Sequence, residues 1–300
     1  MLERGYTMHH AISQDKQGNI LATVSKTSAK IANGKDVRIN DFIIMMDPEK
    51  GEILQEWDLV HMLDSARYGM TDYDLTSDPF AQSASNWAHN NGIVEWGDDY
   101  LATARYQGIF KFNKAGGIEW IISPHGYWRD KYLKLLLNPL HADGTPITDP
   151  EVIAGTKNCD DFEWPWGCHT AVPLPNGHIL YFNNGYGRNF KLDFTDRKNI
   201  YTCGIEYEVD EVNRTVRQVW QYGKERGAAY FTPARSGVQY LEQTGNRLIC
   251  PGMSNVLSNG NRGARVTEVD PETQEIVFEL ELEDAIYQRV YRMSLYPDNQ

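Results

Sequence analysis

The chain has 300 residues, of which 41% are hydrophobic and 23% are charged, as in a globular domain with a buried core. Its formal net charge of −12 argues against nucleic acid and against an anionic membrane surface as partners. No segment holds the roughly 18 consecutive apolar residues of a membrane helix. The 8 Trp, 17 Tyr and 10 Phe favour stacked sheets and therefore an all-β fold.

In chain order, the sequence predicts four copies of one unit, a group of short strands joined by turns that contain Gly, Asn or Asp. The strands are expected at 9–12, 18–23, 41–47 and 52–57; at 87–94, 100–105, 108–112 and 118–121; at 168–172, 176–182, 204–210 and 215–220; and at 236–241, 245–249, 264–270 and 275–280. Three of the last strands end in Trp57, Trp120 and Trp220, with Phe278 at the corresponding place in the fourth. Repeated four-stranded units that are too small to bury their own faces are typical of β-propeller blades.

The predicted fold class is therefore an all-β β-propeller that forms a single domain over residues 1–300. Four blades and a closing strand at 287–295 make a small ring, so we expect the first blades to be missing from this chain. Insertions at about 61–86 and 123–167 are expected to build or cover a site, and the second holds a predicted helix at 129–137. An incomplete ring exposes two blade faces, and we expect it to associate, for instance as a homodimer.

The four cysteines, Cys159, Cys168, Cys203 and Cys250, lack the spacing of metal ligands, so we predict no metal centre. A disulfide between Cys159 and Cys168 and four free thiols are both compatible with the sequence. The first residues are not followed by the apolar stretch of a signal peptide. The expected compartment is therefore the cytoplasm, unless the natural start of the protein lies further upstream.

Polar residues that could carry chemistry stand just before, inside or just after the first two strands of a predicted blade. They lie in the segments 86–91, 166–171 and 183–188, which contain His89, His169 and Arg188. Because the innermost strands of a propeller line its central channel, these side chains are expected to converge and form an anion site. A neutral imidazole can also attack an electrophilic sulfur or phosphorus. The alternative is that both histidines are core residues that hydrogen-bond neighbouring blades.

Several segments in order resemble the bacterial aryl-sulfate sulfotransferases. They are WAHNN at 87–91, CHTAVPLPNGHILYFNNGYGR at 168–188 and IEYEVDEVNRTVRQVWQYGKERG at 205–227. His9 and His10, which precede a Gly-Asn turn, and the predicted strand at 41–47 also fit the pattern. The similarity covers essentially all 300 residues.

The resemblance implies a six-bladed propeller with an additional N-terminal β-domain, exported to the periplasm. It implies transfer of a sulfuryl group from an aryl sulfate to a phenol through a sulfohistidine intermediate, with no nucleotide sulfate and no other cofactor. The sequence agrees with the last point, because it contains no GxxxxGK[ST] phosphate-binding loop.

Carried over by position, His89, His169 and Arg188 match the residues that contact the sulfuryl oxygens in the family. One histidine would take the sulfuryl group, while Arg188 and the other histidine stabilise charge and protonate the leaving phenolate. The remaining candidate positions are expected to bind substrate, and Trp87 and Tyr186 among them to stack on the aryl ring. They are Trp87, Asn90, Thr170, Asn184, Tyr186 and Arg235.

One departure from the family pattern concerns the nucleophile. The resemblance places the modified histidine in a blade after the arginine, but this chain has no histidine beyond His178. Arg235 lies in the stretch where such a residue is expected, so the transfer chemistry is either lost or moved to His169. Two other functions stay open: a propeller that binds aryl sulfates or other anions without turnover, and a scaffold for protein contacts.

Overall fold

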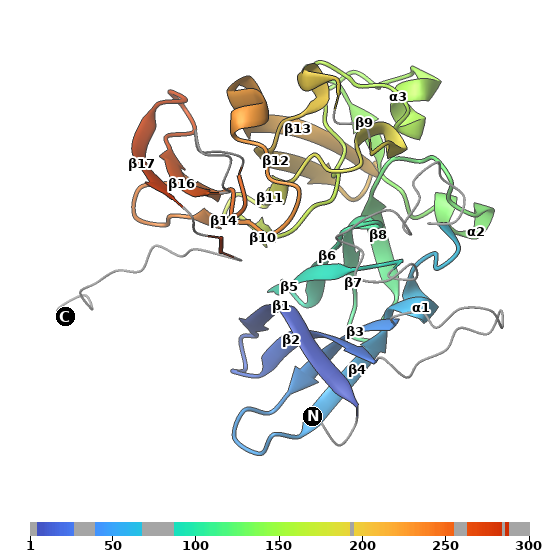
Figure 1. Ribbon diagram of the computed structural model, residues 1–300. Coiled ribbons are helices and arrows are strands. Elements are labelled where there is room, and N and C mark those ends of the chain that lie inside the picture. Colours follow the sequence, from blue (N-terminus) through green and yellow to red (C-terminus); the bar gives the residue numbers. More distant parts are fainter. Residues whose placement is uncertain are drawn as a thin grey trace.

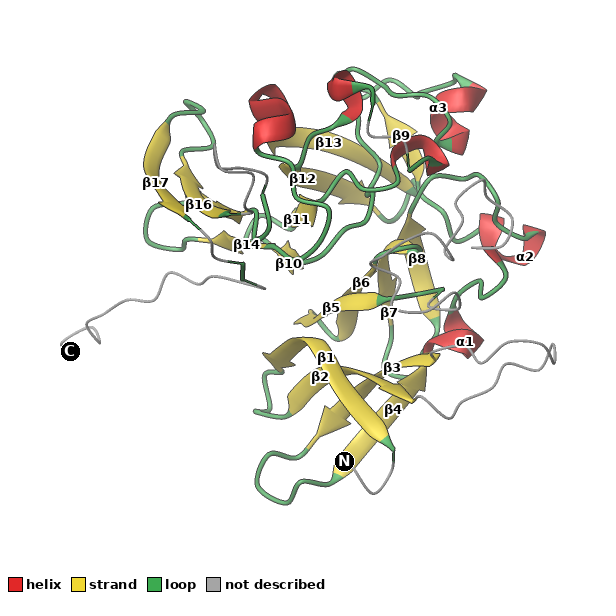
Figure 2. Ribbon diagram, in the orientation of Figure 1, coloured by secondary structure: helices red, strands yellow, loops and turns green. Residues whose placement is uncertain are grey.

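The computed structural model describes residues 5–26, 40–67, 87–192, 195–254, 263–283 and 286–287. In these parts the chain forms four sheets, each built around four antiparallel strands that follow one another in the sequence, and the third has a fifth, parallel strand at its edge. The all-β class predicted from the sequence is confirmed, and so are four consecutive four-stranded units (Figures 1 and 2). None of the sheets is closed, and the propeller itself stays a prediction.

The first sheet consists of β1 (Tyr6–Gln14), β2 (Ile20–Lys26), β3 (Asn40–Met46) and β4 (Ile53–Asp58). The second consists of β5 (Asn90–Trp96), β6 (Asp99–Ala104), β7 (Gly108–Phe112) and β8 (Ile118–Ile122). The third contains β10 (Ala171–Pro173), β11 (Ile179–Asn183), β12 (Cys203–Asp210) and β13 (Thr215–Tyr222), and β9 (Asn138–Leu140) pairs parallel to β13. The fourth contains β14 (Gly237–Tyr240), β15 (Arg247–Cys250), β16 (Ala264–Val269) and β17 (Ile276–Leu282).

The turn between the third and fourth strands has the same chemistry in every sheet. It begins at Asp47, Asn113, Asp210 and Asp270, and Oδ1 of each side chain accepts the backbone N–H two residues further on, at 2.9, 3.1, 3.0 and 2.8 Å. Such a side chain closes the turn by replacing a backbone acceptor. These four residues therefore explain why the sequence repeats as it does.

The four sheets follow one another along an open arc, with their first strands toward its inner side (Figure 1). β1 packs against β5, β5 against β10, and β10 against β14. A Cβ atom at Gly92 in β5 would lie 2.7 Å from Oγ1 of Thr103 and 3.4 Å from the carbonyl oxygen of His169. Only a glycine allows the second and third sheets to approach this closely.

Aromatic side chains fill the seams between successive sheets. The indole N–H of Trp57 in β4 donates to the carbonyl oxygen of Lys114 at 3.0 Å, in a turn of the second sheet. Trp120 in β8 donates in the same way to the carboxylate of Glu211 at 2.8 Å, in a turn of the third sheet. Trp57 and Trp120, which end the first two units, thus each link one sheet to the next.

The second insertion forms α2 (Asp130–Leu133), β9 and α3 (Pro150–Ala154) at the outer side of the arc (Figure 2). The predicted helix at 129–137 is wrong in its length, because it ends at Leu133. The next residues pair with the edge of β8 instead: Ile121 donates to the carbonyl oxygen of Leu135 at 2.8 Å, and Leu137 donates to that of Ile121 at 3.0 Å. An available strand edge outcompetes local helix propensity here.

Other sequence predictions fall on the edges of the described residues. Of the first insertion, the structure describes α1 (Leu59–Met62) and the residues up to 67. The expected closing strand lies outside the described residues from 288 onward. In the described residues, no helix has the length and apolar character needed to span a bilayer. All four cysteines are free thiols, which is one of the two states that the sequence allowed. The alternative, a Cys159–Cys168 disulfide, is not formed.

Candidate functional site

A polar residue stands within or just before the first strand in each sheet. These residues are His10 in β1, His89 before β5, His169 before β10 and Arg235 before β14. His10, His89 and Arg235 have φ angles of 53°, 52° and 64°, which residues other than glycine rarely adopt. The strand register also shifts between Met8 and Ile12 in β1, around His10, and between Asn90 and Gly92 in β5, just after His89; such a bulge re-aims side chains out of the normal strand alternation.

The imidazoles of three sheets meet at the inner side of the arc. Nε2 of His89 lies 3.2 Å from Nε2 of His10, with 4.7 Å between the ring centres. The ring of His169 lies 6.1 Å from that of His10. The cluster continues through His9, whose Nδ1 lies 2.9 Å from Nδ1 of His10 and whose Nε2 lies 3.3 Å from Oδ1 of Asp41. Two ring nitrogens can bond only if one carries the proton, so the contacts of His10 with His9 and with His89 each need one N–H donor.

His169 is held in one tautomer by its neighbours. Its Nδ1 lies 2.6 Å from Oδ1 of Asn184, and the amide nitrogen of Asn184 donates to the carbonyl oxygens of Thr232 at 2.9 Å and Arg235 at 3.1 Å. The amide oxygen therefore faces the ring and must accept the Nδ1 proton. Nε2 of His169 accepts the backbone N–H of Arg235 at 3.0 Å. Both ring nitrogens are thus engaged.

The positive charge in the cluster comes from Arg105, directly after β6. This residue is 3% exposed, and its backbone N–H donates to the carbonyl oxygen of His89 at 2.9 Å. Its Nη2 donates to the carbonyl oxygen of Pro233 at 2.8 Å, and its guanidinium lies 4.5 Å from the ring centre of Tyr186. A buried guanidinium beside aromatic rings and imidazoles is a suitable partner for an oxyanion.

Both site histidines are neutral at physiological pH. Burial holds the pKa of His89 well below its usual value, and the nearby His10 and Arg105 lower it further. Burial is also the main cause that lowers the pKa of His169, followed by the charge of Arg105. Because only the neutral imidazole has a free electron pair on one nitrogen, these pKa values favour nucleophilic and general-base chemistry.

Arg188 lies in an ion pair of its own rather than with the histidines. Its guanidinium bonds the carboxylate of Glu163, and both side chains are 3% exposed. The hydroxyl of Tyr201 donates to the same carboxylate at 2.6 Å, and its ring centre lies 3.9 Å from the Arg188 guanidinium. The structure therefore brings His89 and His169 together with His10 and Arg105, and it gives Arg188 a buried partner.

Among the predicted substrate-binding residues, Trp87 and Asn90 are turned into the protein. Trp87 is 0% exposed and belongs to the core between the first and second sheets. The backbone N–H of Asn90 donates to Oδ2 of Asp41 at 2.9 Å, and its side-chain amide lies 2.7 Å from the carbonyl oxygen of Thr103. Both residues therefore support the strand that follows His89.

The other predicted residues lie closer to the imidazoles. Asn184 touches His169 directly, and Tyr186 packs on Arg105. Thr170 is buried beside His169, and its carbonyl oxygen accepts the N–H of Phe182 at 2.8 Å. Arg235 contributes its backbone N–H to His169, while its side chain is exposed.

Sequence reasoning assigned no role to Arg105 and His10. One available signal was position, because Arg105 and Asn184 both follow the second strand of their sheets, next to the histidine of the first strand. His10 was visible in the His9-His10 pair ahead of a turn, but neighbours along one strand do not reveal a contact with His89 in another sheet.

Neutral imidazoles next to the inner strands of consecutive sheets, beside a buried guanidinium, are an arrangement that can bind an oxyanion in an all-β protein. The sequence matches the family model described as Arylsulfotransferase (ASST) over residues 1–292, and the chain belongs to this family.

Two curated relatives carry the name arylsulfate sulfotransferase AssT. The one from Escherichia coli O6:H1 is 28% identical over 330 aligned residues, which include 100% of this chain and 54% of the relative. The one from Lelliottia amnigena is 29% identical over 331 residues, with the same shares. The chain thus spans about half the length of the curated relatives it matches.

Proposed function

We propose that this chain carries the transfer site of an aryl-sulfate sulfotransferase, which moves a sulfuryl group from a phenolic sulfate to a phenol. One observation carries the proposal: the neutral imidazoles of His89 and His169 lie in the field of the buried guanidinium of Arg105. Family membership and the names of the two relatives support it. The donor is an aryl sulfate, so the reaction needs no nucleotide sulfate.

We further propose that the four sheets are consecutive blades of a β-propeller. Each sheet begins with its inner strand and passes outward strand by strand, and each first strand packs against the next. This is the order expected for blades around a common axis. The positions of His10, His89, His169 and Arg235 then correspond from blade to blade.

In the first half-reaction, Nε2 of His169 forms a bond to sulfur while the bond from sulfur to the aryl oxygen breaks. Asn184 supports this role because its amide oxygen accepts a hydrogen bond from the Nδ1–H of His169. The proton therefore stays on Nδ1, and the electron pair is on Nε2. The N–H of Arg235, which bonds Nε2 at 3.0 Å, must give way to the sulfur atom. Arg105 stabilises the charge on the sulfuryl oxygens.

The departing phenolate needs a proton, and the pair of His10 and His89 supplies it when the pair holds one extra proton between its facing Nε2 atoms, because a neutral imidazole is too weak an acid to protonate a phenolate. Their Nε2 atoms lie 3.2 Å apart, and His9 and Asp41 extend the pair away from the transfer site. In the second half-reaction an acceptor phenol returns a proton to the pair, and its oxygen attacks sulfur and releases Nε2 of His169. Protons and electron pairs balance over the two steps.

Arg188 is proposed to position the site rather than to bind sulfate. Its Nε donates to the carbonyl oxygen of Asn199 at 3.3 Å, and its ion pair with Glu163 anchors the loop after β11 that carries Asn184 and Tyr186. Tyr186 and the nearby Tyr106 offer aromatic faces for the aryl ring. The substrate-binding role of Thr170 stays a proposal on position alone.

A second candidate function is binding of aryl sulfates or other anions without turnover. It is favoured by the two hydrogen bonds that occupy both ring nitrogens of His169, and by Arg235 at the corresponding position of the fourth sheet. In this case the N–H of Arg235 stays on Nε2 and no covalent bond forms.

Incubation with p-nitrophenyl sulfate, with and without phenol, tests the proposal. Release of p-nitrophenol only when phenol is present supports transfer. Saturable binding of the donor without release supports the second candidate. If the chain neither binds the donor nor releases p-nitrophenol, both candidate functions are contradicted. A scaffold for protein contacts is then favoured.

We propose the periplasm as the compartment, on the resemblance to exported family members, with the cytoplasm as the alternative. Fractionation of the source cells with an antibody against this chain decides between them.

A further inference from the structure

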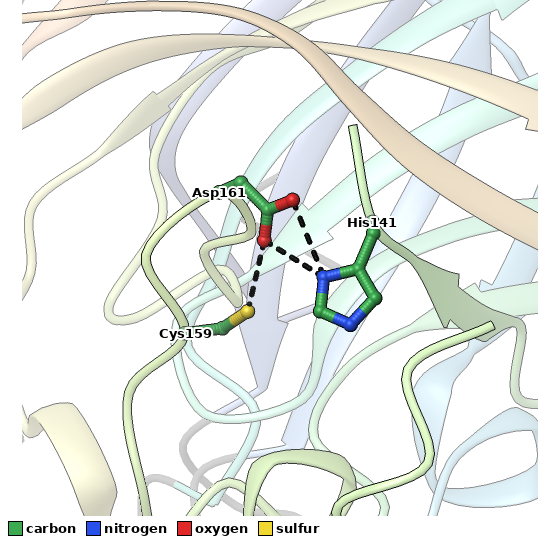
Figure 3. Close-up of side chains that lie close together, drawn as sticks. All are labelled: His141, Cys159 and Asp161. Carbon is green, nitrogen blue, oxygen red and sulfur yellow. Dashed lines mark hydrogen bonds and ion pairs between the residues drawn. The ribbon is translucent and has the colours of Figure 1, made fainter. Parts of the chain in front are cut away.

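A second cluster of reactive side chains lies in the 123–167 insertion, apart from the residues of the transfer site. His141 follows β9, while Cys159 and Asp161 lie between α3 and β10. Nδ1 of His141 lies 3.0 Å and 3.2 Å from the two carboxylate oxygens of Asp161, and Sγ of Cys159 lies 3.1 Å from Oδ1. Figure 3 shows the three side chains pointing toward one another.

We propose that His141, Cys159 and Asp161 bind one Zn²⁺ ion. They offer one nitrogen, one sulfur and one oxygen atom, and these atoms all lie within 4.8 Å of one another. This donor set suits zinc, which takes imidazole, thiolate and carboxylate in tetrahedral geometry. Zinc bond lengths of about 2.0–2.3 Å place neighbouring donors roughly 3.3–3.6 Å apart, so only small side-chain adjustments are needed.

The surroundings of the cluster favour an ordered site with an open position. Oδ2 of Asp161 accepts the backbone N–H of Ala142 at 2.9 Å, which orients the carboxylate from outside the donor set. The side chains of His141 and Asp161 are 39% and 37% exposed, so a water molecule can fill the fourth position. Sequence spacing did not reveal the site, because only one of its donors is a cysteine and because His141 lies on a segment distant from Cys159 and Asp161.

The ion would join two segments of the insertion. His141 lies just beyond the strand that pairs with β13, and Asp161 lies at the start of the segment that leads to His169. We therefore infer a stabilising role, in which zinc fixes the approach of this segment to the third sheet. Binding replaces the thiol proton of Cys159, which is released to solvent. The proposal does not depend on sulfuryl transfer.

The test uses the 300-residue chain, freed of metal with a chelator under reducing conditions. Zn²⁺ is titrated in competition with a chromophoric chelator, and Co²⁺ is titrated with absorption spectroscopy. We expect one Zn²⁺ per chain, a Co²⁺ spectrum with a thiolate charge-transfer band, and a higher melting temperature with zinc. Cys159→Ser and His141→Gln should each weaken zinc binding by at least about tenfold, and Cys159→Ser should remove the band.

The matched control is His61→Gln, because the side chain of His61 is 82% exposed and lies outside the cluster. This variant should bind zinc as the original chain does. Circular dichroism verifies that all variants are folded, as expected for substitutions of partly exposed residues. Zinc binding that is equal in Cys159→Ser, His141→Gln and the original chain would overturn the proposal, and so would a Co²⁺ spectrum without the thiolate band.

Discussion

At the scale of single residues, the proposed transfer chemistry depends on which nitrogen of His169 holds a proton. Asn184 is itself oriented by two backbone carbonyl groups, so its oxygen can only face the imidazole. Burial and the charge of Arg105 lower the pKa of His169 and so disfavour protonation of the second nitrogen. The electron pair on Nε2 is therefore a consequence of burial, Asn184 and Arg105, and not of the histidine alone.

Replacement of this imidazole tests its assigned role. His169→Ala should lower turnover of p-nitrophenyl sulfate with phenol by roughly a thousandfold or more, in line with the 10²–10⁴-fold contributions of positioned acid–base groups. Steady-state rates measure the effect, with His61→Ala as an exposed control. An unchanged rate in His169→Ala would place the nucleophile elsewhere.

Arg105 and Arg188, which are both buried, should respond differently to loss of charge. Arg105→Gln should reduce kcat by about 10²–10³-fold, because its charge opposes that of the sulfuryl oxygens. It should also move the acidic limb of the pH–rate profile to higher pH, since Arg105 lowers the pKa of His89 and of His169. The rate and its pH profile are measured together.

Arg188→Gln is the contrasting variant. It leaves the buried carboxylate of Glu163 without its cation, and the free energy of unfolding should fall by about 3–5 kcal/mol. Denaturant titration measures this loss. A normal stability combined with a large loss of kcat would show that Arg188, and not Arg105, acts on the substrate.

Stability should decrease in mild acid because of the same histidines. The pKa values of His89 and His169 are lowered in the folded protein. Below about pH 6.5 these two histidines therefore become protonated in the unfolded chain but stay neutral in the folded chain. Each histidine then removes up to about 1.4 kcal/mol of stability per pH unit as the pH falls. Denaturant titrations between pH 7.5 and about pH 5 should show the loss, and it should be smaller in His89→Gln.

At the scale of elements, the four sheets depend on repeated local features that the sequence displays. The Asp or Asn that opens each outer turn, and the tryptophan at the end of three outer strands, both recur at matching places. This is why the strands were predictable. The helix expected at 129–137 was not, because the strand edge of β8 that shortens it becomes available only after the sheet has formed.

The tryptophan links can be tested by comparing two of them. Trp120→Phe removes the hydrogen bond to Glu211 from a side chain that is 1% exposed, and should lower the free energy of unfolding by roughly 1–3 kcal/mol. Trp220→Phe is the control, because the indole N–H of Trp220 has no hydrogen-bond partner among the described residues. An equal loss in both variants, measured by denaturant titration, would mean that ring size and not the hydrogen bond matters.

At the scale of the whole molecule, the last strand presents apolar side chains to solvent. Ile276, Val277, Phe278 and Leu280 in β17 are 46%, 57%, 50% and 43% exposed. The corresponding aromatic residues of the first two sheets, Trp57 and Trp120, are buried against the next sheet. Adjacent exposed apolar residues of this kind usually mark a contact surface.

We therefore expect the 300-residue chain to associate through β17. The double variant Val277→Lys and Phe278→Lys places a charge on each face of the strand and should shift the mass toward the monomer. Size-exclusion chromatography with light scattering, over a range of protein concentrations, measures the molar mass in solution. Leu133→Lys in α2 changes an equally exposed apolar residue and should leave the mass unaltered. A monomer at all concentrations for the original chain would contradict the prediction.

The sequence by itself determined the all-β class, the four repeated units and two of the site histidines. These properties follow from local patterns: turn residues, strand periodicity, and histidines placed next to the inner strands. Only the tertiary structure decided which charges face those histidines. Arg105 and Arg188 each come after the second strand of a sheet, at a similar sequence distance from the histidine of the preceding strand, so the sequence does not distinguish them. Packing between sheets gives Arg188 the buried carboxylate of Glu163 and leaves Arg105 beside the imidazoles. Such a choice depends on contacts between sheets, which no local pattern contains.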